Sequence, residues 1–131
     1  MKISKEVEEI LTDMALLAEK LHHEFVTPEH LLFVLTYNDI FSESFTQCGG
    51  QIGKLRTNLE KYMKENVDSI SEGKAELSSG LSEVLMEAEG QAISSDRFVV
   101  ETTHLLYHLY LSMADRFVNL HRHCQHLHPE Q

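Results

Sequence analysis

The chain has 131 residues, which suits one domain, and its 42% hydrophobic content is enough for a single core without disulfides or metals. Its 21 acidic and 11 basic residues give a net charge of −10, which argues against nucleic acid or an anionic membrane as a partner. No apolar run is long enough to span a membrane and the N-terminus is charged, so we expect a cytoplasmic protein. Cys48 and Cys124 are interpreted as reduced thiols in the core.

The first part of the chain predicts a long helix followed by a second, sharply started one. Apolar residues recur at steps of three and four from Val7 to Leu21, which is typical of one buried helix face. Thr27 is a favoured N-cap, and Pro28 fits the first helical position because its missing N–H is harmless there. The second helix then buries three leucines, Leu31, Leu32 and Leu35.

Two more helices and a polar segment complete the first half. A short helix carries Phe41, Phe45 and Cys48 at helical spacing and stops at Gly49-Gly50, because glycine enters the left-handed region without penalty. The fourth helix carries apolar residues at Ile52, Leu55, Leu59, Tyr62 and Met63. Residues 67–78 are polar and predict a flexible connection, and no segment of the chain predicts a β-strand.

After the connection the pattern starts again. An offset of 74 residues superimposes His30-Leu31-Leu32 on His104-Leu105-Leu106 and also aligns the apolar stripes of the two long helices. We therefore predict an all-α fold of two pseudo-two-fold four-helix repeats within a single domain, residues 1–131. Repeat one covers 1–66, the connection 67–78 and an incomplete repeat two 79–131. Because the counterpart of helix four would begin near His128, the second repeat is expected to lack its last helix, which favours self-association through the uncovered face.

The motif Val26-Thr27-Pro28-Glu29-His30-Leu31-Leu32, set in a tandem repeat of about 75 residues, resembles the N-terminal (Clp repeat) domain of Clp-type AAA+ unfoldases. The resemblance covers nearly the whole chain and is closest to the A-type ATPase that works with the Clp peptidase. It implies a protein-binding module that docks adaptors or substrates for the motor and peptidase subunits. No GxxxxGK[ST] phosphate loop is present, so we expect no ATPase activity, no other enzyme activity and no cofactor.

The resemblance also indicates where a protein or peptide would bind. The candidates are the motif residues Thr27 and Glu29 of repeat one and their counterparts Glu101 and Thr103 of repeat two. In some family members the paired glutamates of the two motifs line a pocket for phosphorylated arginine. Here Thr103 replaces the second glutamate, so that pair is incomplete.

Histidines provide the other candidates for chemistry. His30 and His104 occupy equivalent first turns, where a side chain that bonds the backbone is the expected role rather than catalysis. Glu101, His104 and His108 share a helix face that can in principle hold a metal, although the neighbouring leucines favour ordinary packing.

The C-terminal segment, residues 121–128, is rich in histidine and raises an alternative function. Three of its side chains lie at helical spacing and are candidate metal ligands, namely His121, Cys124 and His128. A metal-binding or metal-responsive protein, or a truncated fragment of a Clp ATPase without function, is therefore the alternative to a binding module. Calorimetric titration with zinc separates the first of these from a solvated histidine tail.

Overall fold

The computed structural model describes residues 2–96 and 98–113. Five helices and two very short strands have defined bounds: α1 (Lys5–Lys20), β1 (Phe25–Val26), α2 (Pro28–Leu35), α3 (Asp39–Gln47), α4 (Ile52–Asn66), β2 (Glu76–Leu77) and α5 (Ser79–Ser94). A further helix covers residues 102–113. The predicted all-α class is confirmed.

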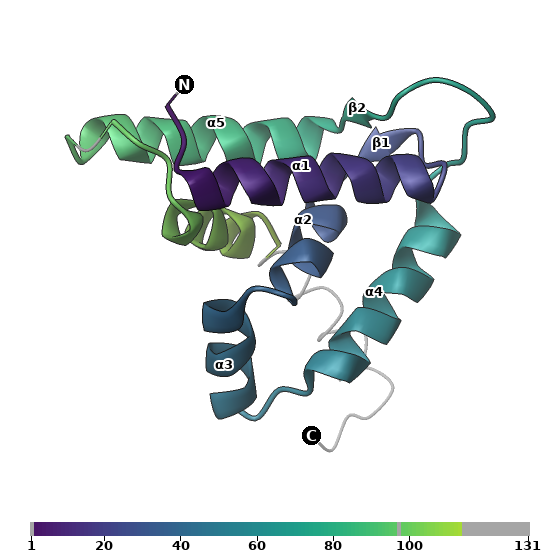
Figure 1. Ribbon diagram of the computed structural model, residues 1–131, viewed down its shortest axis with the longest axis horizontal. Helices are drawn as coiled ribbons and strands as arrows, with labels where there is room; N and C mark the ends of the chain where they lie inside the picture. The colour runs from purple at the N-terminus through teal and green to yellow at the C-terminus, as the bar shows by residue number, and fades with distance from the viewer. Residues whose placement is uncertain (1, 97, 114–131) are drawn as a thin grey trace, which may run out of the picture.

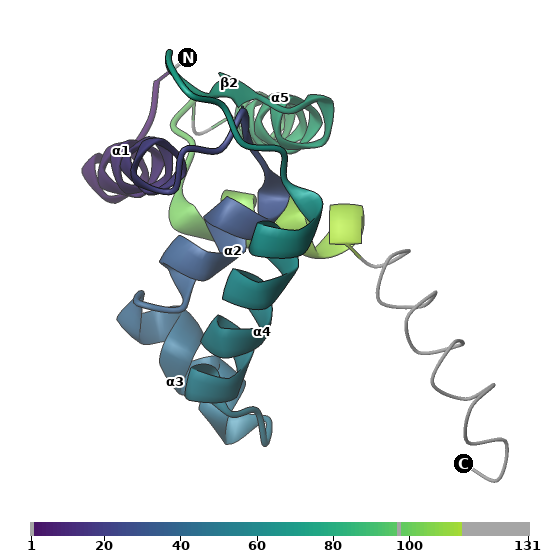
Figure 2. The same ribbon diagram turned by 90° about the vertical axis from the view of Figure 1, so that its right-hand side faces the viewer.

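The helices form crossed layers. α1 and α5 run in opposite directions along the upper edge in Figure 1, and α2 starts beneath them. α3 lies below α2, and α4 rises from the level of α3 alongside α2, as the turned view in Figure 2 also shows. The core lies where these layers meet and contains buried apolar residues of both halves, including Val7, Met14, Leu31, Leu35, Leu81, Val84, Val100 and Leu105.

The internal repeat is reproduced in local detail. α1 and α5 each have 16 residues, and the offset of 74 maps the first and last residue of one onto those of the other. Both helices begin with a serine N-cap: the Ser4 Oγ accepts the N–H of Val7, and the Ser78 Oγ accepts the N–H of Leu81, each over 3.1 Å. The equivalent sequences before α1 and α5 therefore start these two helices with the same N-cap.

The prediction that the chain contains no strand is wrong. β1 and β2 pair in parallel, with Val26 opposite Leu77, and an isolated parallel bridge joins Ile3 to Val100. The offset of 74 converts one pair into the other, so the residues just before each long helix pair with the residues that precede the second helix of the other half. Strands of two residues have no periodicity to detect, because their pairing is fixed by segments far apart in the chain.

These strands also hold the segment that we expected to be a flexible connection. The N–H of Glu24 donates to the carbonyl of Asp68 over 2.8 Å, and the N–H of Ser78 donates to the carbonyl of Val26 over 2.9 Å. Both ends of the connection are therefore bonded to the loop that follows α1.

The end of α3 follows from its two glycines. Gly49 has φ of +91°, its N–H donates to the carbonyl of Thr46, and the Gly50 N–H donates to that of Phe45. This pair of bonds is a Schellman motif, and it confirms the predicted stop. The expectation that Cys48 packs in the core is wrong, because this C-cap residue is exposed.

The two second helices differ in length. α2 ends at Leu35, and its C-cap Thr36, fully buried, donates its hydroxyl to the Phe33 carbonyl over 2.6 Å. Arg56 of α4 donates to the Thr36 Oγ1 over 3.0 Å and to its carbonyl over 2.9 Å. The Arg56 side chain thus provides hydrogen-bond donors at the C-terminus of α2. The equivalent helix of the second repeat is longer and reaches residue 113.

Candidate functional site

The candidate site consists of the first turns of α2 and of the helix at residues 102–113, which we call the motif turns (residues 27–30 and 101–104). In the first, Thr27 has extended backbone and Pro28 opens the helix, as the sequence predicts. The N–H of Thr27 donates to His30 Nδ1 over 2.9 Å, and the Thr27 hydroxyl lies 2.8 Å from the same nitrogen. His30 therefore takes the position that a glutamate or glutamine has in an ordinary capping box.

A second histidine completes this arrangement. His23 Nδ1 lies 2.8 Å from His30 Nε2, and the two rings meet edge to face. Because His30 Nδ1 accepts a backbone N–H, its proton is on Nε2, which donates to His23 Nδ1. His30 is fully buried and His23 is 5% exposed.

Burial disfavours a charge on either ring. It lowers the pKa of His23 below the ordinary 6.5, and burial together with the smaller effect of His23 lowers the pKa of His30 to about 4. Both rings are neutral near pH 7. Both nitrogens of His30 are hydrogen-bonded, one to His23 and the other to the Thr27 backbone. This geometry supports the expected structural role of His30.

The second motif turn repeats the same bond. The N–H of Glu101 donates to His104 Nδ1 over 3.0 Å, and His104 is 8% exposed. Each turn also touches the first helix of the other repeat. The Thr102 hydroxyl donates to the Glu6 carboxylate of α1, while a side chain at Gly80 of α5 would lie 3.6 Å from Pro28. The two motif turns are therefore equivalent in both capping and packing.

The four candidate binding residues differ in their exposure. Glu101 and Thr103 are exposed on the second motif turn, and Thr27 is partly buried. Glu29 is only 4% exposed, and its neighbour Pro28 lies next to Gly80 at the start of α5. A partner can thus reach the second turn directly, whereas at the first turn the structure presents Glu29 mostly to the interior.

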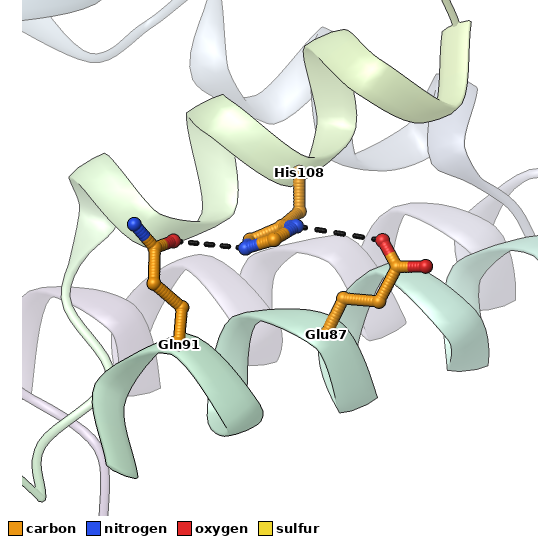
Figure 3. A network of polar contacts seen from close by, with 3 residues as sticks. All are labelled: Glu87, Gln91 and His108. Carbon is orange, nitrogen blue, oxygen red and sulfur yellow. Dashed lines mark hydrogen bonds and ion pairs between the residues drawn. The ribbon is translucent and has the colours of Figure 1, made fainter. Parts of the chain in front are cut away.

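The candidate metal ligands do not converge. His104 turns to its own backbone, and His108 faces α5, where its Nε2 lies 2.8 Å from the Gln91 Oε1 (Figure 3). Within residues 2–96 and 98–113, no group of three His, Cys, Asp or Glu side chains can hold a metal ion. The tail candidates lie outside the described residues: His121, Cys124 and His128.

One surface feature was not identified from the sequence. A groove between α1 and the loop from α2 into α3 has an acidic rim, to which α1 contributes Glu6, Glu9 and Asp13. These three lie at i, i+3 and i+7, so they share one helix face. Their spacing was a readable signal, but only the fold shows that this face borders a groove.

The fold and the two motif turns define a helical domain made of a tandem repeat, in which short extended segments of one half pair with those of the other. Residues 2–117 match the model of the Clp repeat (R) N-terminal domain, and the chain belongs to this family. The predicted resemblance to the Clp repeat family is confirmed. None of the curated proteins matches the chain at a significant level.

Solved structures share the fold. The Hsp104 N-terminal domain from Candida albicans has a TM-score of 0.78 and 13% identity, covering 90% of this chain and 79% of that one. The N-domain of ClpV from Vibrio cholerae has a TM-score of 0.71 and 21% identity, with coverage of 88% and 69%. A complex of the ClpV N-domain with VipB peptide scores 0.70 at 21% identity, with coverage of 88% and 71%. In the part of this chain that the structure describes, no helix is long and apolar enough to cross a membrane.

Proposed function

We propose that this chain is a protein-binding module that docks adaptors or substrates for an ATP-dependent Clp unfoldase or protease and performs no chemistry itself. The observation that carries the proposal is membership of the Clp repeat family over residues 2–117. The motif histidines support a role without catalysis, because both bond the backbone of their own turn. The printed sequence also contains no GxxxxGK[ST] loop to hold nucleotide phosphates.

Peptide binding is consistent with this fold, since the ClpV N-domain has been solved in complex with VipB peptide. We assign the contact to the motif turns, with Thr27 and Glu29 in one and Glu101 and Thr103 in the other. Because Glu101 and Thr103 are exposed, they are the residues that a partner touches first. Self-association through repeat two stays a prediction, since it depends on residues 114–131, which lie outside the described part.

A pull-down tests the proposal. The tagged chain is incubated with the Clp motor, peptidase and adaptor proteins of the same cell, and the bound proteins are quantified. We expect the wild type to retain at least one of them and the double variant Glu101→Arg/Thr103→Arg to retain much less.

The control is Thr57→Arg/Glu65→Arg, which makes the same two replacements at exposed positions of α4. It should bind like the wild type. If the wild type retains no Clp protein, the proposed function is wrong. If both double variants bind equally, the function stands but the assignment to the motif turns does not.

A further inference from the structure

The groove between α1 and the α2–α3 loop has a volume of about 390 Å³ and combines acidic with apolar residues. We call it the acidic groove, and it is lined by Glu6, Glu9, Ile10, Asp13, Val34, Tyr37, Asn38, Asp39 and Ile40. No lysine or arginine is among these residues. Tyr37 and Ile40 are 62% and 67% exposed, so their side chains are open to contact by a partner.

Two basic side chains, Lys5 and Arg56, lie beside the acidic groove without lining it. Lys5 lines the neighbouring hollow on α1, which it shares with Glu9 and Asp13. The guanidinium of Arg56 lies 3.8 Å from the Tyr37 ring centre and is bonded to Thr36. Within the described residues, neither Glu9 nor Asp13 has an ion-pair partner.

In the second repeat, the carboxylate equivalent to that of Asp13 lies next to a histidine. The offset of 74 places Glu87 of α5 at the position of Asp13 and His108 at that of Val34. In Figure 3 the His108 ring lies between two side chains of α5, with Nδ1 3.4 Å from the Glu87 carboxylate. His108 Nδ1 is buried and has no other partner among the described residues. Repeat two therefore places an imidazole nitrogen beside its own carboxylate, whereas repeat one has the apolar Val34 at that position.

We propose that the acidic groove docks a basic amphipathic segment of a partner protein, with lysine or arginine facing Glu9 and Asp13 and apolar side chains on Tyr37 and Ile40. The inference rests on the proposed function and names the chemistry of one partner. Two observations carry it: the absence of lysine and arginine from the groove lining, and the imidazole that faces the equivalent carboxylate in repeat two. Exposed aromatic and aliphatic side chains then select an amphipathic segment over a purely charged one.

The probe is a fluorescein-labelled peptide of about 16 residues made of Leu, Lys and Arg, with apolar residues at helical spacing. A scrambled peptide of the same composition and a version with Glu in place of Lys and Arg are compared. Fluorescence anisotropy gives Kd for the full chain at low salt. We expect a Kd of about micromolar for the amphipathic basic peptide, at least fivefold weaker binding of the scrambled one, and none of the acidic one.

Three variants of the chain locate the contact. Glu9→Gln/Asp13→Asn should weaken binding about fivefold, since each exposed ion pair contributes modestly. Val34→His copies repeat two and should also weaken binding, because the chain then provides its own base. Ile40→Ser should weaken the amphipathic peptide more than the scrambled one. Glu9 and Asp13 are exposed, so the first variant keeps the fold, which circular dichroism verifies.

The matched control is Glu65→Gln/Glu72→Gln, which makes the same change in net charge at exposed positions away from the groove. It should stay within about twofold of wild type. Equal losses in both double variants, equal binding of the scrambled peptide, or no binding would overturn the inference. The pull-down on wild type separates the two proposals: Clp partners retained without peptide binding refute only the groove, and the reverse result refutes only the Clp assignment.

Discussion

Acidification should destabilise this domain through its buried histidine pair. In an unfolded chain a histidine has a pKa of about 6.5, whereas burial and His23 hold that of folded His30 at about 4. Between these values the unfolded chain binds a proton that the folded chain does not. The stability contributed by neutral His30 is therefore complete above pH 6.5 and is lost as the pH falls towards 4.

The magnitude follows from these two pKa values. At pH 7 the folded ring is unprotonated and the unfolded ring is mostly so, whereas at pH 5 the unfolded ring is protonated and the folded ring is mostly not. Linkage then gives a loss of about 2 kcal/mol in the free energy of unfolding between pH 7 and pH 5 from His30. A small domain has about 5–15 kcal/mol in total, so the effect is measurable. His23, whose pKa is also lowered by burial, acts in the same direction.

Urea unfolding followed by circular dichroism at pH 5, 6 and 7 measures this slope. His30→Gln should be less stable at pH 7 and should lose about 2 kcal/mol less than wild type on acidification. His104→Gln removes the equivalent backbone bond of repeat two and controls for loss of a cap alone. An unchanged slope in His30→Gln would refute the reasoning, because the pH dependence would then come from other groups.

Two further changes test the fold in simpler ways. Arg56→Ala removes both hydrogen bonds to buried Thr36 and the contact with Tyr37, and should cost about 1–3 kcal/mol in urea unfolding. Arg56→Lys should recover only part of this loss, and full recovery would show that charge alone matters. Gly49→Ala should destabilise the domain by about 1 kcal/mol, because φ at this position is +91°. Gly53→Ala lies in open space within α4 and should slightly stabilise it. Thermal melting measures both, and the reverse order of the two variants would contradict the argument.

Local chemistry in the sequence determined the helices and the repeat. Thr27 and Pro28 start α2 because an N-cap and a proline act within one turn, and Gly49 ends α3 because it enters the left-handed region. The offset of 74 was visible because both halves keep the same apolar spacing. The family resemblance could be predicted from the motif at residues 26–32 together with this repeat, and the family model over residues 2–117 confirms it.

Only the tertiary structure determined the strand pairing, the burial of individual side chains and the shape of the surface. The pairs Val26–Leu77 and Ile3–Val100 combine strands too short to have a pattern of their own. Glu29 is buried, which its motif alone does not indicate, and the acidic groove depends on where the start of α3 lies relative to α1. Helix caps and apolar periodicity depend on residues close together in the chain, so they can be recognised from the sequence alone. Burial and surface shape depend on which helices pack together, and therefore only the folded chain defines them.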